Sequence, residues 1–226
     1  MVRAVIFDFD GVIANSEPLH FRAFRDVLAD EAVALSESDY YSNYLGFDDV
    51  GVFRAIGAER GASWNVDRVA SLAARKATRL EELERDGSVL FPGADAAVRR
   101  LALALPLAIA SGALRAEIMR VLNRTGLAQH FAAVVAAEDT LAGKPAPDPY
   151  LRAVNLLSAI AGQSLVPQEC VAVEDSVWGL ESARAAGLRT IAVTHTYSAA
   201  TLSIADLVIA DLDALNLASL GQISDA

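Results

Sequence analysis

The amino-acid sequence predicts an α/β fold, namely a doubly wound, mostly parallel sheet with a small all-helical insert. Two observations predict it. Short apolar runs of strand length alternate with helical patterns, and the stretch from residue 15 to residue 88 contains no clear strand. The chain of 226 residues is 54% hydrophobic, with a mean hydropathy of +0.33, so it can bury a core of this kind.

The expected strands are apolar throughout rather than alternating, which is typical of strands buried on both faces of a parallel sheet. Each is four to six residues long and is separated from the next by a helical pattern or a loop. The six runs are Val2–Phe7, Leu107–Ala110, Ala133–Ala136, Cys170–Val173, Arg189–Val193 and Leu207–Ala210.

Helical patterns lie between these runs, and three of them are followed by a glycine where a helix C-cap belongs. The glycines are Gly126, Gly162 and Gly187. The helical patterns are Asp95–Ala104, Arg115–Arg124, Pro149–Ile160 and Ser176–Ala186.

The segment 15–88 is expected to form this helical insert, and residues 1–14 and 89–226 the α/β core. Its longest helical pattern is charged and runs from Ser63 to Arg85. The flanking sequences, Ala14-Asn15-Ser16 and Gly87-Ser88, are natural hinges.

Composition and charge exclude several classes of protein. A formal net charge of -10 gives no broad positive field for nucleic acid. The longest apolar stretch, Leu101 to Ala110, contains Pro106 and is too short to span a bilayer. The apolar run at the N-terminus is too short for a signal peptide. We therefore expect a cytoplasmic protein that acts as a monomer, with no nucleic-acid or membrane partner.

Acidic residues follow two of the expected strands. Asp8 and Asp10 follow the first run, and Glu174 and Asp175 follow the run that begins at Cys170. Residues two apart in an extended segment point the same way, so we expect Asp8 and Asp10 to face one side. Carboxylates that converge at a switch point of a parallel sheet repel one another. A Mg²⁺ ion with oxygen ligands relieves this repulsion.

Two further fragments indicate a phosphate site. Ser111 and Gly112 follow the second strand and precede a helix, where a hydroxyl and backbone N–H groups can meet an anion. Lys144 lies in the sequence Gly-Lys-Pro-Ala-Pro-Asp-Pro, whose prolines forbid helix and fix the direction of the ammonium group.

These four motifs, in this order, resemble those of the haloacid dehalogenase-like superfamily: Asp-x-Asp-Gly-Val after the first strand, Ser after the second, Lys-Pro-x-Pro-x-Pro, and Glu-Asp-Ser. They span nearly the whole chain. The insert after the first motif resembles the small helical cap of that superfamily. The sequence Ser16-Glu17-Pro18-Leu19-His20 resembles the start of the cap in its β-phosphoglucomutase and sugar-phosphatase branch.

The resemblance implies a role for each of these residues. Asp8 would be the nucleophile that forms an aspartyl-phosphate. Asp10 would be the general acid for the leaving alcohol and then the base that activates water. Ser111 and Lys144 would hold the phosphoryl oxygens.

The resemblance also implies a Mg²⁺ site. Its ligands would be the Asp8 carboxylate, the Asp10 backbone carbonyl and Asp175. Glu174 would act directly or through water, because adjacent strand residues face opposite ways.

Three polar residues of the cap are candidate substrate contacts. Glu17 and His20 lie three residues apart on one face of a helix and would approach the active site when the cap closes. The alternative is that Ser16 caps this helix and Glu17 only favours its start. Lys76 either meets a substrate anion or lies on a solvated helix face. His195 follows the fifth expected strand, and no pattern assigns it a role.

The loop Tyr44–Asp49 distinguishes two reactions. It resembles the loop that, in phosphoglucomutases, reaches into the active site and carries an arginine that holds a second phosphate, whereas here it contains Phe47, Asp48 and Asp49. We therefore expect a phosphatase acting on a small phosphorylated metabolite, either a sugar phosphate or phosphoglycolate. The alternative is a β-phosphoglucomutase-type phosphomutase.

Two other classes fit the residues less well. A haloacid dehalogenase would not need Asp10 or the pair Glu174-Asp175. A phospho-receiver module places its aspartate after the third strand and lacks an insert of this size.

Overall fold

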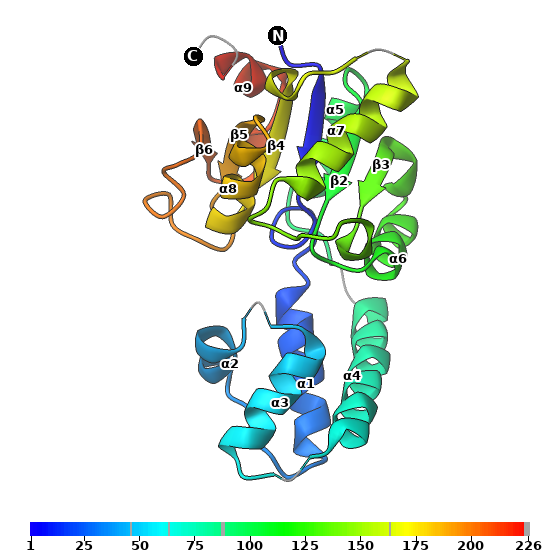
Figure 1. The fold of residues 1–226 in the computed structure, drawn as a ribbon, viewed down its shortest axis with the longest axis vertical. Coiled ribbons are helices and arrows are strands. Elements are labelled where there is room, and N and C mark those ends of the chain that lie inside the picture. The colour runs from blue at the N-terminus through cyan, green and yellow to red at the C-terminus, as the bar shows by residue number, and fades with distance from the viewer. Residues whose placement is uncertain (46, 63, 87–88, 163, 224–226) are drawn as a thin grey trace. The chain divides into compact units, whose positions relative to one another are not determined.

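A computed structural model of the chain describes residues 1–45, 47–62, 64–86, 89–162 and 164–223 (Figure 1). The chain divides into two compact units. One consists of Met1–Asn15 and Leu90–Ala226, and the other of Ser16–Val89.

The first unit contains a parallel sheet with the order β3-β2-β1-β4-β5-β6, six strands within the described residues. The sheet and the inserted helices confirm the predicted α/β class. The strands are β1 (Ala4–Phe7), β2 (Leu107–Ala110), β3 (Phe131–Val135), β4 (Cys170–Glu174), β5 (Arg189–Val193) and β6 (Leu207–Ile209).

The α-helices are shared between the two units. The second unit contains α1 (Glu17–Ala29), α2 (Glu37–Asn43), α3 (Asp49–Glu59) and α4 (Val66–Asp86). The first contains α5 (Ala94–Ala102), α6 (Arg115–Thr125), α7 (Asp148–Ala161), α8 (Val177–Ala185) and α9 (Leu217–Gln222). Short 3₁₀ helices cover Ala128–His130, Ala137–Asp139, Pro167–Glu169 and Leu212–Ala214.

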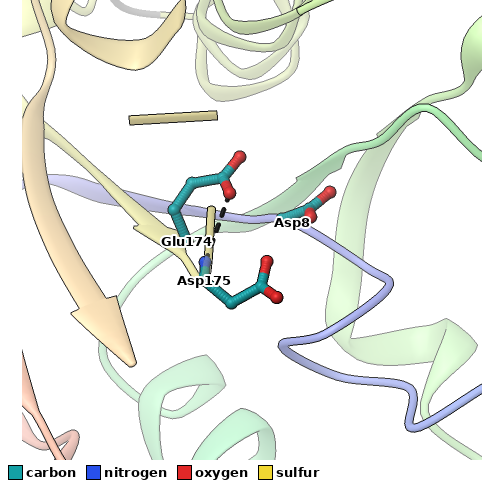
Figure 2. A group of neighbouring side chains, drawn as sticks. All are labelled: Asp8, Glu174 and Asp175. Carbon is teal, nitrogen blue, oxygen red and sulfur yellow. Dashed lines mark hydrogen bonds between the residues drawn. The ribbon is translucent and has the colours of Figure 1, made fainter. Parts of the chain in front are cut away.

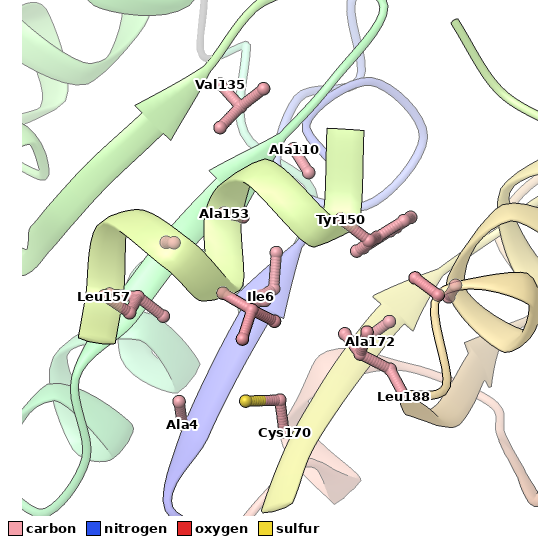
Figure 3. Packing of buried hydrophobic residues seen from close by; sticks show 14 of the residues in the cluster. Ala4, Ile6, Ala110, Val135, Tyr150, Ala153, Leu157, Cys170, Ala172 and Leu188 are labelled. Carbon is pink, nitrogen blue, oxygen red and sulfur yellow. The ribbon is translucent and has the colours of Figure 1, made fainter. Parts of the chain in front are cut away.

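Helices α7 and α8 cover one face of the sheet, and Figure 3 shows their side chains packed on the strands. Alternate residues of β1, Ala4 and Ile6, belong to this buried cluster, together with Ala153 and Leu157 of α7. Every residue of β1 is buried, so the strand is covered on both faces as predicted.

The prediction that all six strands are buried on both faces is wrong for β3 and β6. In β3, Ala132 is exposed and Val134 is half-buried, and in β6 Leu207 and Val208 are half-buried. Both strands lie at an edge of the sheet, where cover by neighbouring elements is incomplete.

Glycines end the helices as expected. Gly126 and Gly162 adopt the left-handed conformation at the C-caps of α6 and α7. Gly187, which follows α8, has a φ of 84°. A side chain is disfavoured at this φ, which accounts for glycine at these positions.

The sheet order creates a switch point between β1 and β4. The chain runs outward from β1 through β2 to β3, and then crosses back to place β4 on the other side of β1. The carboxyl ends of β1 and β4 therefore lie side by side, with the connecting loops diverging, which is where open α/β sheets bind ligands.

The second unit has a core of its own. Helix α4 packs against α1 and α3, and Phe24, Phe53 and Leu72 are buried in its centre. The expected hinge at Gly87-Ser88 and the expected helix start at Ser63 fall outside the described residues. Among the residues that the structure describes, no helix combines the length and the apolar character needed to cross a membrane.

Candidate active site

Three buried carboxylates meet at the switch point. Asp8 follows β1, Glu174 ends β4 and Asp175 comes directly after it. Each offers a carboxylate oxygen within 4.8 Å of the others. Figure 2 shows Asp8 and Asp175 extending toward the same side, while Glu174 turns away from Asp175. The alternation of side chains along β4 separates the two neighbours, as the sequence predicts.

Asp8 is fixed by its backbone and by an ammonium group. Its N–H donates to the carbonyl of Val173 at 2.9 Å, and its Oδ1 accepts from Lys144 Nζ at 2.8 Å. Burial raises the pKa of Asp8 well above its ordinary value, and Glu174 and Asp175 add to this. Lys144 opposes the rise in pKa, so this ammonium favours the ionised form of Asp8.

Glu174 is completely buried and surrounded by donors. Its Oε1 accepts from Lys144 Nζ and from the Tyr150 hydroxyl, both at 2.6 Å. Its Oε2 accepts from the Ser176 hydroxyl at 3.2 Å. These hydrogen bonds compensate the burial of its charge and tie Glu174 to Lys144.

Lys144 bridges the two strand ends. Burial by itself lowers the pKa of Lys144, but the Asp8 and Glu174 carboxylates outweigh burial and raise the pKa above its ordinary value. The ammonium is therefore charged at neutral pH. The structure thus brings Lys144, predicted as a phosphate-site residue, beside Asp8.

Sequence reasoning missed Tyr150. This residue of α7 is fully buried, donates to Glu174, and lies with its ring centroid 5.1 Å from Lys144 Nζ. Burial and the Glu174 charge raise the pKa of Tyr150, so the hydroxyl stays protonated and remains a donor. No local pattern predicts this contact, because Glu174 lies on another segment of the chain.

The buried carboxylate of Asp175 accepts fewer of the hydrogen bonds described here than that of Glu174. Burial raises the pKa of Asp175 to about 6, a hydrogen bond from Thr196 opposes the rise, and the Glu174 charge adds to it. In the folded protein Asp175 therefore changes from protonated to ionised as the pH rises through about 6.

Asp10 is outside the group of carboxylates that lie within 4.8 Å of one another, among the residues the structure describes. Three of the four predicted acids therefore converge, and the expectation that Asp8 and Asp10 face one side stays a prediction. Strand β1 ends at Phe7, and the chain bends at once, with a φ of 77° at Gly11. Asp10 pairs through its backbone with Ala14.

Ser111 and Gly112 follow β2 as predicted, but the expected free N–H groups are only partly present. Ser111 is buried; its N–H donates to Val135, and its Oγ accepts from the N–H of Ala113, both at 3.0 Å. The helix begins later, at Arg115. A Cβ added at Gly112 would meet only open space, so the Gly112 backbone is accessible to an anion.

Lys76 is buried, with 1% of its side chain exposed, so the interpretation as a solvated lysine is wrong. Its Nζ donates to Asp49 Oδ1 at 2.6 Å and to His20 Nδ1 at 2.9 Å. It also lies 4.6 Å from the ring centroid of Phe24. A buried ammonium requires a counter-charge, and Asp49 supplies it from a different helix.

Glu17 lies in the first turn of α1 and accepts a hydrogen bond from the Tyr40 hydroxyl. Burial raises the pKa of Glu17, and Tyr40 and the Lys76 charge oppose this. Ser16 occupies the N-cap position, but its side chain accepts no capping hydrogen bond. The helical unit thus contains a polar cluster built from Glu17, His20, Lys76, Tyr40 and Asp49.

The site at the switch point fits a divalent cation. Its oxygen donors are the hard ligands that Mg²⁺ prefers. Three carboxylates lie there, and Lys144 is the one ammonium that contacts them among the described residues. Burial raises the pKa values of Asp8 and Asp175, and the neighbouring carboxylates add to this rise.

Comparison with known proteins agrees with this geometry. Residues 5–193 match the haloacid dehalogenase-like hydrolase family. Protein CbbY of Rhodobacter capsulatus is 33% identical over 230 residues, which cover 94% of this chain and 95% of that protein. Hexitol phosphatase B of Escherichia coli (strain K12) is 33% identical over 195 residues, covering 85% and 83%.

A solved structure of CbbY from Rhodobacter sphaeroides in complex with phosphate superimposes with a TM-score of 0.80. It is 25% identical and covers 98% of this chain and 100% of that one. The fold, the acidic switch point and the family match lead to one conclusion. The chain belongs to the haloacid dehalogenase-like hydrolases, in the branch that holds CbbY and the sugar phosphatases, and it is a phosphatase of that family.

Proposed function

We propose that the protein hydrolyses the phosphate ester of a small phosphorylated sugar or sugar alcohol through an aspartyl-phosphate on Asp8. One observation carries the proposal: a buried carboxylate at the switch point contacts an ammonium at 2.8 Å and lies beside Asp175. Hexitol phosphatase B, at 33% identity, supports a polyol or sugar phosphate as the substrate class. Phosphoglycolate is the smaller alternative.

In the proposed reaction an oxygen of Asp8 attacks phosphorus, and the bond between phosphorus and the substrate oxygen breaks. Asp10 gives its proton to the departing alcohol. A water molecule then attacks the aspartyl-phosphate and transfers a proton to Asp10. Inorganic phosphate leaves, and the Asp8 carboxylate is restored.

The remaining residues hold the phosphoryl group. Lys144 neutralises charge beside Asp8. The Ser111 hydroxyl and the Gly112 backbone N–H donate hydrogen bonds to the other phosphoryl oxygens. We assign Glu174 to Lys144 rather than to the metal, because both its carboxylate oxygens already accept hydrogen bonds. Tyr150 completes that support.

We propose that Asp8 and Asp175 hold Mg²⁺, with the Asp10 backbone carbonyl as a third ligand. The bound ion supplies positive charge that favours the ionised carboxylates and the developing charge on the phosphoryl oxygens. This role matches the raised pKa values of Asp8 and Asp175.

Glu17, His20 and Lys76 remain candidates for selecting the substrate, and their polar cluster favours a phosphatase over a mutase. A mutase must hold a second phosphate with a cation. Here Asp49 already neutralises Lys76, and Asp48 caps α3 by accepting from the N–H of Gly51 at 2.6 Å. The phosphomutase is the second candidate function.

Replacing the nucleophile tests the reaction. Asp8→Asn keeps the shape of the side chain and removes its charge, so phosphate release should fall by several orders of magnitude. Because burial penalises the ionised form of Asp8, the unfolding temperature of this variant should not fall. Phosphate release and thermal unfolding are measured together. Asp95→Asn, at an exposed aspartate of the same unit that pairs with Arg99, should leave phosphate release unchanged. Turnover of Asp8→Asn near the wild-type rate would refute the mechanism.

The raised pKa of Asp175 predicts how pH alters the effect of Mg²⁺ on stability. The folded state keeps its proton up to about pH 6, whereas the ordinary pKa is 3.8. The folded protein therefore binds more protons in this window, and metal-free stability decreases as pH rises through it. Mg²⁺ should raise the unfolding temperature more at about pH 7.5 than at about pH 5, because only the ionised carboxylate binds the cation. The experiment is thermal unfolding with and without Mg²⁺ at both pH values. If Mg²⁺ raised the unfolding temperature of Asp175→Asn protein as much as that of the wild type at about pH 7.5, Asp175 would not be a metal ligand.

Product analysis separates the two candidate reactions. The protein is incubated with β-glucose 1-phosphate, a trace of the 1,6-bisphosphate and Mg²⁺, and both free phosphate and glucose 6-phosphate are followed. With Lys76 neutralised by Asp49, we expect free phosphate and no accumulation of glucose 6-phosphate. Rapid formation of glucose 6-phosphate with little free phosphate would establish the mutase instead.

A further inference from the structure

Asp10 lies in a tight turn, residues 9–14, that follows β1. The N–H groups of Ile13 and Ala14 both donate to the carbonyl of Phe9 at 2.8 Å, and the N–H of Gly11 donates to Ala14 at 2.9 Å. These bonds define the turn internally. They do not fix its position relative to the carboxylates of β4, which requires contacts from other segments.

On one side the turn lies directly against Asp175. A Cβ added at Gly11 would come within 2.0 Å of Asp175 Oδ2, and the φ of Gly11 is 77°. The backbone next to Asp10 therefore occupies the space beside this carboxylate, and any side chain at Gly11 would displace one of them.

His195 holds the turn with a hydrogen bond. It follows β5, and its Nδ1 lies 2.9 Å from the carbonyl oxygen of Gly11. A carbonyl oxygen only accepts, so Nδ1 carries the proton and donates. The Gly11 carbonyl is one residue beyond Asp10, so this bond acts on the backbone that directs the Asp10 side chain.

The His195 ring is itself fixed by Phe91. The two rings are stacked, with centroids 3.9 Å apart and planes at 13°. The N–H of Phe91 donates to the carbonyl of Ile13 at 3.0 Å, so Phe91 bonds to the same turn that His195 holds. The neighbouring residue, Thr196, hydrogen-bonds to Asp175. The segment after β5 thus contacts both the Asp10 turn and the candidate metal ligand.

We infer that His195 is a positioning residue for Asp10: through the Gly11 carbonyl it sets the place from which Asp10 gives its proton to the leaving alcohol. The inference rests on the proposed function, because it assumes that Asp10 is the general acid. His195 itself need not touch the substrate.

Two variants separate the hydrogen bond from the ring packing. His195→Phe keeps an aromatic ring for Phe91 and removes the donor. His195→Asn removes the ring and keeps an N–H close to the place of Nδ1. His130→Phe is the matched control, since the ring of His130 contacts Arg99 in the same unit at 3.2 Å.

Each protein is assayed with two substrates that differ in the leaving group. One is the phosphorylated sugar that the wild type hydrolyses fastest, whose alcohol must be protonated as it departs. The other is p-nitrophenyl phosphate, whose leaving group departs as an anion. The value of kcat/KM covers the steps up to the breaking of the ester bond, so the ratio of the two values reports the general acid. A misfolded fraction lowers both values equally and leaves the ratio unchanged.

In His195→Phe the ratio of kcat/KM for the sugar phosphate to that for p-nitrophenyl phosphate should fall about tenfold, because a displaced general acid loses much of its effect. His195→Asn should restore most of the ratio, and His130→Phe should leave it unchanged. If the wild type is active, two results would overturn this inference alone. One is an unchanged ratio in His195→Phe, and the other is a fall of the ratio in His195→Asn as large as that in His195→Phe. A wild type that hydrolyses neither substrate would overturn the proposed function and this inference with it.

Discussion

The burial of three carboxylates beside a single lysine is the constraint on which the rest of this structure depends. Two unit charges about 4 Å apart, at an effective dielectric constant of about 20, interact with about 4 kcal/mol, so the repulsion is of the same order as the stability of a domain. The sheet brings Asp8 and Asp175 together regardless, because their strands are neighbours at the switch point. Lys144 compensates part of the charge, whereas burial and the neighbouring carboxylates raise the pKa values of Asp8 and Asp175. A site of this kind is poised to bind a cation and, with it, an anionic phosphoryl group.

Several residues from other segments of the chain donate hydrogen bonds to the buried carboxylates or leave space for them. Tyr150 and Ser176 donate to Glu174, which in turn holds Lys144 against Asp8. Gly11 and Gly179 leave room for the acids: an added Cβ would come within 2.0 Å of Asp175 and of Glu174, respectively. The carboxylates therefore determine side-chain identity on α7, on α8 and in the Asp10 turn.

Much of the fold could be predicted because it depends on local patterns. All six strands were found from their apolar runs, and the opposite directions of Glu174 and Asp175 from strand alternation. What failed depends on contacts between segments far apart in the sequence. Lys76 lies in a charged helical sequence, yet its ammonium is buried, where it forms an ion pair with Asp49 and a hydrogen bond with His20. Nothing in the local sequence of Tyr150 or His195 reveals its hydrogen-bond partner, because Glu174 and Gly11 lie on other segments.

The central claim is that the phosphoryl group passes through Asp8, and trapping that intermediate tests it most directly. Asp10→Asn protein with Mg²⁺ and p-nitrophenyl phosphate can be phosphorylated, because this leaving group needs no proton, but it lacks the base that activates water. Mixing should release a burst of one nitrophenolate per enzyme molecule. Mass spectrometry of the acid-quenched protein should then find phosphate on Asp8. The absence of both the burst and the modification, in a preparation whose wild type turns over, would contradict the account.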